Sequence, residues 1–153
     1  MPARADGGIV QSDYAGAAVP VLYSLRTRVT LAQLNAGFTL LAAIAGRNYR
    51  LVSCCLTAIG GAATTGTSVN VIGTRAAAPV QLFVAAVAGL TQSTVLRAGS
   101  PFATAGTASI VCLADGASFA PLDVNTGVTV ITVGSAMTVM TNLDVDLAFV
   151  IEG

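Results

Sequence analysis

The chain has 153 residues, the length of one domain, and its charged residues are seven arginines and seven acids. Hydrophobic residues make up 54% of the chain and charged residues 9%, against roughly 25% charged in ordinary soluble domains. Without histidine or lysine, the chain lacks the residues for Ser-His-Asp, Cys-His and Schiff-base catalysis and for imidazole metal sites. We therefore predict no enzyme, no catalytic residue and no cofactor. The balanced, scattered charges also argue against binding to nucleic acid.

The first 19 residues, MPARADGGIVQSDYAGAAV, show no hydrophobic periodicity and mix Gly, Ala, Asp and Pro. We expect residues 1–19 to form an extended N-terminal arm that becomes ordered only when it lies on another surface. No apolar segment follows MPARADGG as it does in a secretory signal, so we expect no export by that route.

The pattern changes after Pro20 to that of successive strands. The segment VLYSLRTRVT alternates with a period of two, which predicts a half-buried strand with Tyr23, Leu25, Thr27 and Val29 on one face and Ser24, Arg26 and Arg28 on the other. Thr30 is expected to cap a single helical turn, LAQLNAG, that Gly37 closes. The apolar runs 38–44 and 49–59, joined by the turn 45–48, predict a hairpin, followed by a small-residue loop that Gly60 and Gly61 open.

Further strands are expected over residues 68–73, 79–87 and 128–134. The near-continuous apolar run 107–114 predicts a central buried strand, and a turn-rich loop follows over residues 115–127. The last strand, LDVDLAFVIE, alternates most clearly, with Leu143, Val145, Leu147, Phe149 and Ile151 on one face and Asp144, Asp146, Ala148, Val150 and Glu152 on the other.

Short strands at intervals of roughly 8–12 residues, with glycine-rich turns between them, predict an all-β fold. We expect residues 20–153 to form an antiparallel β-sandwich with a jelly-roll-like winding. The longest uncharged apolar segment, 76–90, contains Pro79 and Gln81 and is shorter than the about 20 residues that a membrane-spanning helix needs, so we expect no contact with a membrane.

Neither the cysteines nor the aspartates form a clear metal motif. Cys54, Cys55 and Cys112 have no CxxC spacing, and adjacent strand residues point to opposite faces, so we interpret them as small buried hydrophobic residues in a reducing compartment. Asp144 and Asp146 are expected about 7 Å apart on one strand face. They are either solvated or paired with arginine, or they bind calcium together with Asp115 or Asp123.

The shortage of charge has a consequence for the surface of the protein. A folded monomer of this length exposes on the order of 7,000 Å², which leaves about one charge per 500 Å². Wide uncharged patches usually mark interfaces, and a net charge of zero adds no repulsion between copies. We therefore expect other chains to cover much of this surface.

Three features together resemble the small structural proteins of tailed-bacteriophage virions: the Ala/Gly-rich arm, the stretch TLAQLNAG…LAAIAGRNYRLVSCCLTAIGG, and the strands ending in LDVDLAFVIE. Among these proteins, the chain is most similar to the capsid decoration, or cement, proteins. The resemblance implies a β-sandwich, often jelly-roll-like, that is made in the host cytoplasm and assembles as a homotrimer on the capsid exterior. There it would occupy local or icosahedral threefold positions and clamp neighbouring major capsid subunits after the shell expands.

For such a role, we expect Ile9, Val10 and Tyr14 of the arm to contact the capsid or a neighbouring subunit. Tyr23, Arg26 and Arg28 are the second candidates for partner binding; a floppy tail and solvent-facing arginines remain the alternative. A different function, a receptor- or glycan-binding module at a tail-fibre or baseplate tip, would require exposed aromatic residues on loops. The chain has no tryptophan and only three tyrosines, which counts against that function and leaves an enzyme on a barrel as the least favoured class.

Overall fold

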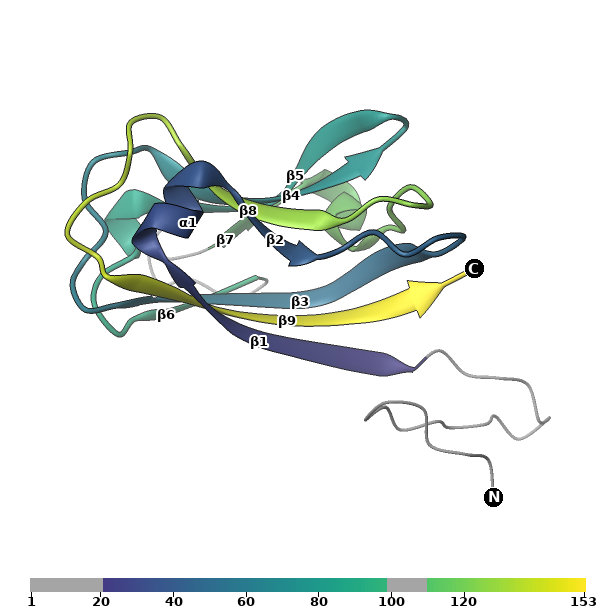
Figure 1. Cartoon of the computed structure of the whole chain (residues 1–153), viewed down its shortest axis with the longest axis horizontal. Helices are drawn as coiled ribbons and strands as arrows, with labels where there is room; N and C mark the ends of the chain where they lie inside the picture. Colours follow the sequence, from purple (N-terminus) through teal and green to yellow (C-terminus); the bar gives the residue numbers. More distant parts are fainter. Residues whose placement is uncertain (1–20, 99–109) are drawn as a thin grey trace, which may run out of the picture.

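The computed structural model describes residues 21–98 and 110–153, which form two antiparallel β-sheets packed face to face (Figure 1). Sheet I has the strand order β1-β9-β3-β6, and sheet II has the order β2-β8-β4-β5-β7. The predicted all-β sandwich is therefore confirmed. Its strands are β1 (Leu22–Thr30), β2 (Phe38–Leu41), β3 (Asn48–Ile59), β4 (Ser68–Arg75), β5 (Ala78–Ala86), β6 (Val95–Arg97), β7 (Ile110–Cys112), β8 (Val128–Val133) and β9 (Asn142–Glu152).

One short α-helix, α1 (Leu31–Ala36), connects the two sheets directly after β1. Thr30 is its N-cap: the Thr30 hydroxyl accepts a hydrogen bond from the Gln33 amide, and the Gln33 side chain accepts one from the Thr30 amide. Gly37 ends the helix with φ 88°, a conformation that favours glycine. The predicted cap, helical turn and closing glycine are thus all present. Two 3-10 helices, η1 (Val87–Gly89) and η2 (Ala114–Phe119), lie in later connections.

The pairing of the strands shows that 38–59 is not a hairpin, contrary to the sequence-based expectation. β2 pairs with β8 in sheet II, whereas β3 pairs with β9 and β6 in sheet I. The turn after β2 therefore carries the chain from one sheet to the other. β2 also ends at Leu41 rather than at the predicted residue 44. Just before Leu41 its register against β8 shifts, and Gly127 packs against the Leu41 carbonyl. Local turn residues signal a change of direction but do not determine which strand becomes the partner.

Two other strands differ from the sequence-based prediction. The run 107–114 does not form a central buried strand: its described part contains β7, three residues at the edge of sheet II, where Val111 is 57% exposed. β6 was not predicted, because it has only three residues, of which Leu96 alone is buried. Neither segment is long enough to show a period of two.

The core lies between the sheets and is built by the inward residues of each strand. β9 alternates as predicted, with Leu143, Val145 and Leu147 almost completely buried. They meet the inward residues of β4, β5 and β8 from the opposite sheet. The side chains that contribute most volume to this core include Phe83, Leu51, Leu56, Leu82, Leu90, Leu96, Met137 and Met140.

Truncating one of these side chains should destabilise the whole sandwich. Leu56 on β3 is fully buried, so Leu56→Ala should lower the free energy of unfolding by about 2–5 kcal/mol. Val52 on the same strand is 42% exposed, and Val52→Ala should cost less than about 1 kcal/mol. Urea unfolding of the two variants tests this, and equal losses would contradict the assignment of the two faces of β3.

Candidate partner interface

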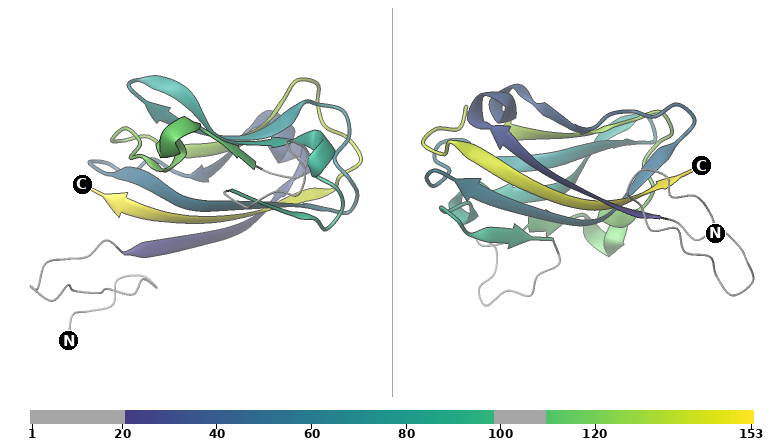
Figure 2. Two further views of the ribbon diagram at one scale, coloured as in Figure 1. Left: turned by 180° about the vertical axis from the view of Figure 1, so that it is seen from behind. Right: turned by 60° about the horizontal axis from the view of Figure 1, so that its bottom comes forward.

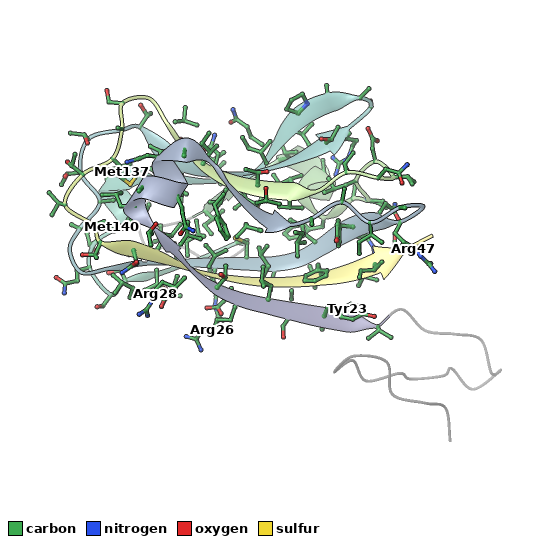
Figure 3. All side chains as sticks on the ribbon, in the orientation of Figure 1. Tyr23, Arg26, Arg28, Arg47, Met137 and Met140 are labelled. Atoms are coloured by element: carbon green, nitrogen blue, oxygen red, sulfur yellow. The ribbon has the colours of Figure 1, made fainter. Side chains whose placement is uncertain are left out.

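The outer face of sheet I carries the charged residues that the sequence singled out. The register of β1 against β9 places Arg28 opposite Asp144 and Arg26 opposite Asp146. The Arg28 guanidinium donates two hydrogen bonds to the Asp144 carboxylate, of 2.6 and 2.8 Å. Arg26 is 80% exposed and reaches Asp146 at 3.3 Å through one nitrogen. Both arginines project outward from β1, as predicted (Figure 3).

The ion pair between Arg28 and Asp144 is the stronger of the two because it is bidentate. The hydrogen bonds from Arg28 lower the pKa of the Asp144 carboxyl below its ordinary value of 3.8. The same bonds raise the pKa of the Arg28 guanidinium. Asp144 therefore remains ionised in the folded protein at any pH near neutrality.

The carboxylates of the two aspartates of β9 thus form ion pairs with arginines of β1. Of the loop acids considered as additional calcium ligands, Asp123 accepts hydrogen bonds from the amides of Ala76 and Ala77, at 3.1 and 2.8 Å, and so holds the β4–β5 turn. Within residues 21–98 and 110–153, no three His, Cys, Asp or Glu side chains gather closely enough to hold a metal ion.

A shallow groove crosses the outer face of sheet I beside these ion pairs. Ser24, Ala148 and Ser53 lie opposite one another on β1, β9 and β3, and their small side chains leave the space. Cys55 lines the groove and is half-buried, whereas Cys54 points into the core. Burial strongly raises the pKa of the Cys54 thiol, so this thiol is not reactive. The adjacent cysteines do lie on opposite faces, as predicted.

The remaining predicted partner-binding residues fall into two groups. Tyr23 is half-buried and stacks on Phe149, with ring centroids 5.7 Å apart, so its ring packs against another residue of the sandwich. Ile9, Val10 and Tyr14 lie outside the described residues. The structure therefore brings Arg26 and Arg28 together on one accessible face and places Tyr23 on the other side of the same strand.

The charged side chains that the structure describes gather in two places. The outer face of sheet I carries Arg26, Arg28, Arg50, Arg97, Asp144, Asp146 and Glu152. The second place is the end of the sandwich where the chain enters β1 and leaves β9; it carries Arg47, Arg75 and Asp123. Arg50 pairs with Glu152 at 2.7 Å, and Arg75 donates to the carbonyls of Ala120 and Pro121.

The opposite end of the sandwich has no charged residue in its loops, a feature that the sequence analysis missed. We call this region the uncharged end and define it as loops 60–67, 87–94 and 134–141, which lie together opposite the C-terminus (Figure 2). The outer face of sheet II, defined by Thr129, Ile131, Val133, Ile72, Val84 and Val111, likewise carries no charge among the described residues. Ser68 and Asn70 point to the same face but are buried. Only the folded topology could reveal this, because the three loops are far apart in the sequence.

Comparisons with protein-family models, with curated proteins and with solved structures find no match to this chain. Within the part of the chain that the structure describes, no helix has the length and apolar character that crossing a bilayer requires.

The Arg28–Asp144 pair should make a pH-dependent contribution to stability. Because folding lowers the pKa of Asp144, the contribution is complete above the ordinary value of 3.8 and is lost as the pH falls through the lower, folded value. Asp144→Asn should therefore be less stable than the wild type at pH 7, and the difference should shrink as the pH falls below 3.8. Urea unfolding at several pH values measures it.

The matched control is Asp146→Asn, which removes the longer and more exposed pair with Arg26. It should lose less stability than Asp144→Asn at pH 7, because exposed single contacts contribute little. A loss at Asp144 that stays constant down to pH 2 would contradict the role of the ion pair.

Proposed function

We propose that the protein is a structural component of a tailed-bacteriophage virion that decorates the capsid exterior and stabilises it by bridging major capsid subunits as a homotrimer. The observation that carries the proposal is the segregation of charge. Among the side chains that the structure describes, the charged ones lie on one sheet face and one end, whereas the other sheet face and the opposite end carry none.

Uncharged surface of this extent suits a protein whose role is to be covered by other chains. Burying a charged group without a partner is costly, and burying an uncharged face avoids that cost. Val111 and Val133, both on the outer face of sheet II, are 57% and 36% exposed and gain from being covered. A bridging protein needs contact area rather than catalytic side chains, which agrees with the absence of histidine and lysine from the sequence.

The proposal includes a jelly-roll-like winding of the sandwich. A jelly roll wraps an antiparallel ribbon of eight strands into two packed sheets. Four nested antiparallel pairs support it here: β1 with β9, β2 with β8, β3 with β6, and β4 with β5. β7 is then an addition at the edge of sheet II.

A glycan-binding module at a tail-fibre or baseplate tip is the alternative. Sugar rings commonly stack on exposed aromatic side chains, but Tyr23 and Tyr49 both pack against Phe149. The Tyr49 hydroxyl also donates to the Ala42 carbonyl at 2.6 Å. These contacts favour the capsid role over the tip role.

Binding to capsids tests the proposal directly. The full chain, mixed with expanded capsids that lack decoration, should co-sediment with them at a fixed ratio to the major capsid protein. The same capsids before expansion serve as the control and should bind less. Co-sedimentation with host cells alone would support the tail-fibre alternative, and binding to neither would contradict both.

The N-terminal arm should strengthen capsid binding without contributing to the stability of the sandwich. Deleting residues 2–19 removes Ile9, Val10 and Tyr14 and should weaken attachment, because an arm that orders on contact extends the bound area. The thermal unfolding midpoint should stay within about 2 °C of the wild type, since the core lies within the described strands. Equal attachment of the two proteins would show that the arm is not a contact.

A further inference from the structure

We propose that the uncharged end is the surface through which copies of this chain associate, with Val139 of each copy meeting Val139 of the others around a rotation axis. This proposal rests on the homotrimer of the proposed function and assigns the surface that holds it together.

The loop 134–141 is held in place by the side chain of Asn35 in α1. The Asn35 amide donates to the Met137 carbonyl at 3.1 Å and accepts from the Met137 amide at 2.9 Å, so it binds both polar groups of one residue. Met137 and Met140 are each 1% exposed and anchor the loop in the core on either side of its apex (Figure 3).

A second set of contacts fixes the loop against residues 60–67. Thr64 and Thr138 exchange two backbone hydrogen bonds, of 3.2 and 3.0 Å, and the Thr141 amide donates to the Ile59 carbonyl at 3.0 Å. Gly61 permits this close approach, because a Cβ atom there would lie 3.1 Å from both Cγ1 and the carbonyl oxygen of Val139. The loop is therefore rigid before any partner binds.

Val139 lies at the apex of this rigid loop in an unfavourable conformation. Its φ is 72°, in the left-handed region that β-branched residues avoid. Its side chain is 65% exposed, the largest exposed fraction among the large hydrophobic side chains of the described residues. Thr65, also β-branched, has φ 56° in the neighbouring loop. Strain that the surrounding structure enforces is characteristic of functional positions.

The hydroxyl groups around Val139 are largely occupied within the chain. The Thr64 and Thr65 hydroxyls donate to the carbonyls of Thr138 and Ala136, at 3.0 and 2.7 Å, and the hydroxyls of Thr91 and Thr94 lie 2.6 Å apart. Dehydrating a hydroxyl that already has a partner costs less than dehydrating a free one. A rigid surface also loses little conformational entropy on binding.

The absence of charge makes a second copy of the chain a compatible occupant of this surface. The uncharged end can meet itself without repulsion, because its loops contain no charged residue. The edge of sheet I is less suited to self-association, because self-pairing of its edge strand β1 about its centre would place Arg26 opposite Arg26. The Val139 side chain also needs no pocket on a partner, because the Val139 side chains of several copies can pack against one another on a rotation axis.

Light scattering of the full chain tests the proposal. The wild type should have the mass of a trimer, and Val139→Asp should be a monomer, with a dissociation constant raised by about 100-fold or more because like charges would meet on the axis. Aspartate tolerates a positive φ better than valine, so the variant should fold. The control is Val124→Asp, at the opposite end, where Val124 is 49% exposed; it should stay trimeric.

Cross-linking provides a second measurement that does not depend on destabilising the assembly. Val139→Cys should form a disulfide between copies under mild oxidation, because the axis brings the Cα atoms within about 7 Å. One chain of each trimer should remain monomeric, since three thiols can form only one disulfide. Val124→Cys and the wild type should show only the background from the native cysteines.

Three results would overturn the proposal: a monomeric wild type at high concentration, a trimeric Val139→Asp, or equal cross-linking of the two cysteine variants. These outcomes differ from a failure of the capsid role. A trimer that dissociates on Val139→Asp but never binds capsids would support the self-association surface and contradict the virion function.

Discussion

The register of β9 between β1 and β3 is the constraint on which the rest of the structure depends. β9 is paired along its length on both sides, and its alternation sends Leu143, Val145 and Leu147 into the core. The same alternation places Asp144 and Asp146 outside, opposite arginines of β1. A slip by one residue would bury both carboxylates and expose the core side chains, so packing and ion pairing enforce the same register.

This register also explains where the few charges lie. Three ion pairs lie at outward positions of β1, β3 and β9, so the exterior of sheet I carries charge that water can solvate. Sheet II has no equivalent among the described residues. At the uncharged end, the Thr64 and Thr65 hydroxyls donate to carbonyls of the same chain. The charged and uncharged parts of the described surface are therefore separate. Under the proposed function, the charged part stays solvated and the uncharged part is the one that other chains cover.

Much of the architecture could be predicted from the sequence wherever a segment was long enough to show its period. β1, β9 and the capped helix after Thr30 were predicted because each carries a local signal, alternation or a capping pattern. The partner of β2, the edge position of β7 and the existence of β6 depend on contacts distant in sequence, and no local pattern encodes them. The outward position of Arg28 followed from alternation, but its pairing with Asp144 depends on the register between β1 and β9. The convergence of three uncharged loops near Val139 likewise required the fold.

Hydrogen exchange of the full chain, followed by mass spectrometry from dilute to assembled concentrations, tests the central claim most directly. The account predicts that exchange slows on assembly in peptides covering residues 60–67, 87–94 and 134–141. Exchange should stay unchanged in residues 42–47 and 76–77, at the end that carries Arg47 and Asp123. Protection confined to the charged end, or no protection at any concentration, would contradict the idea that the uncharged surface exists to be covered.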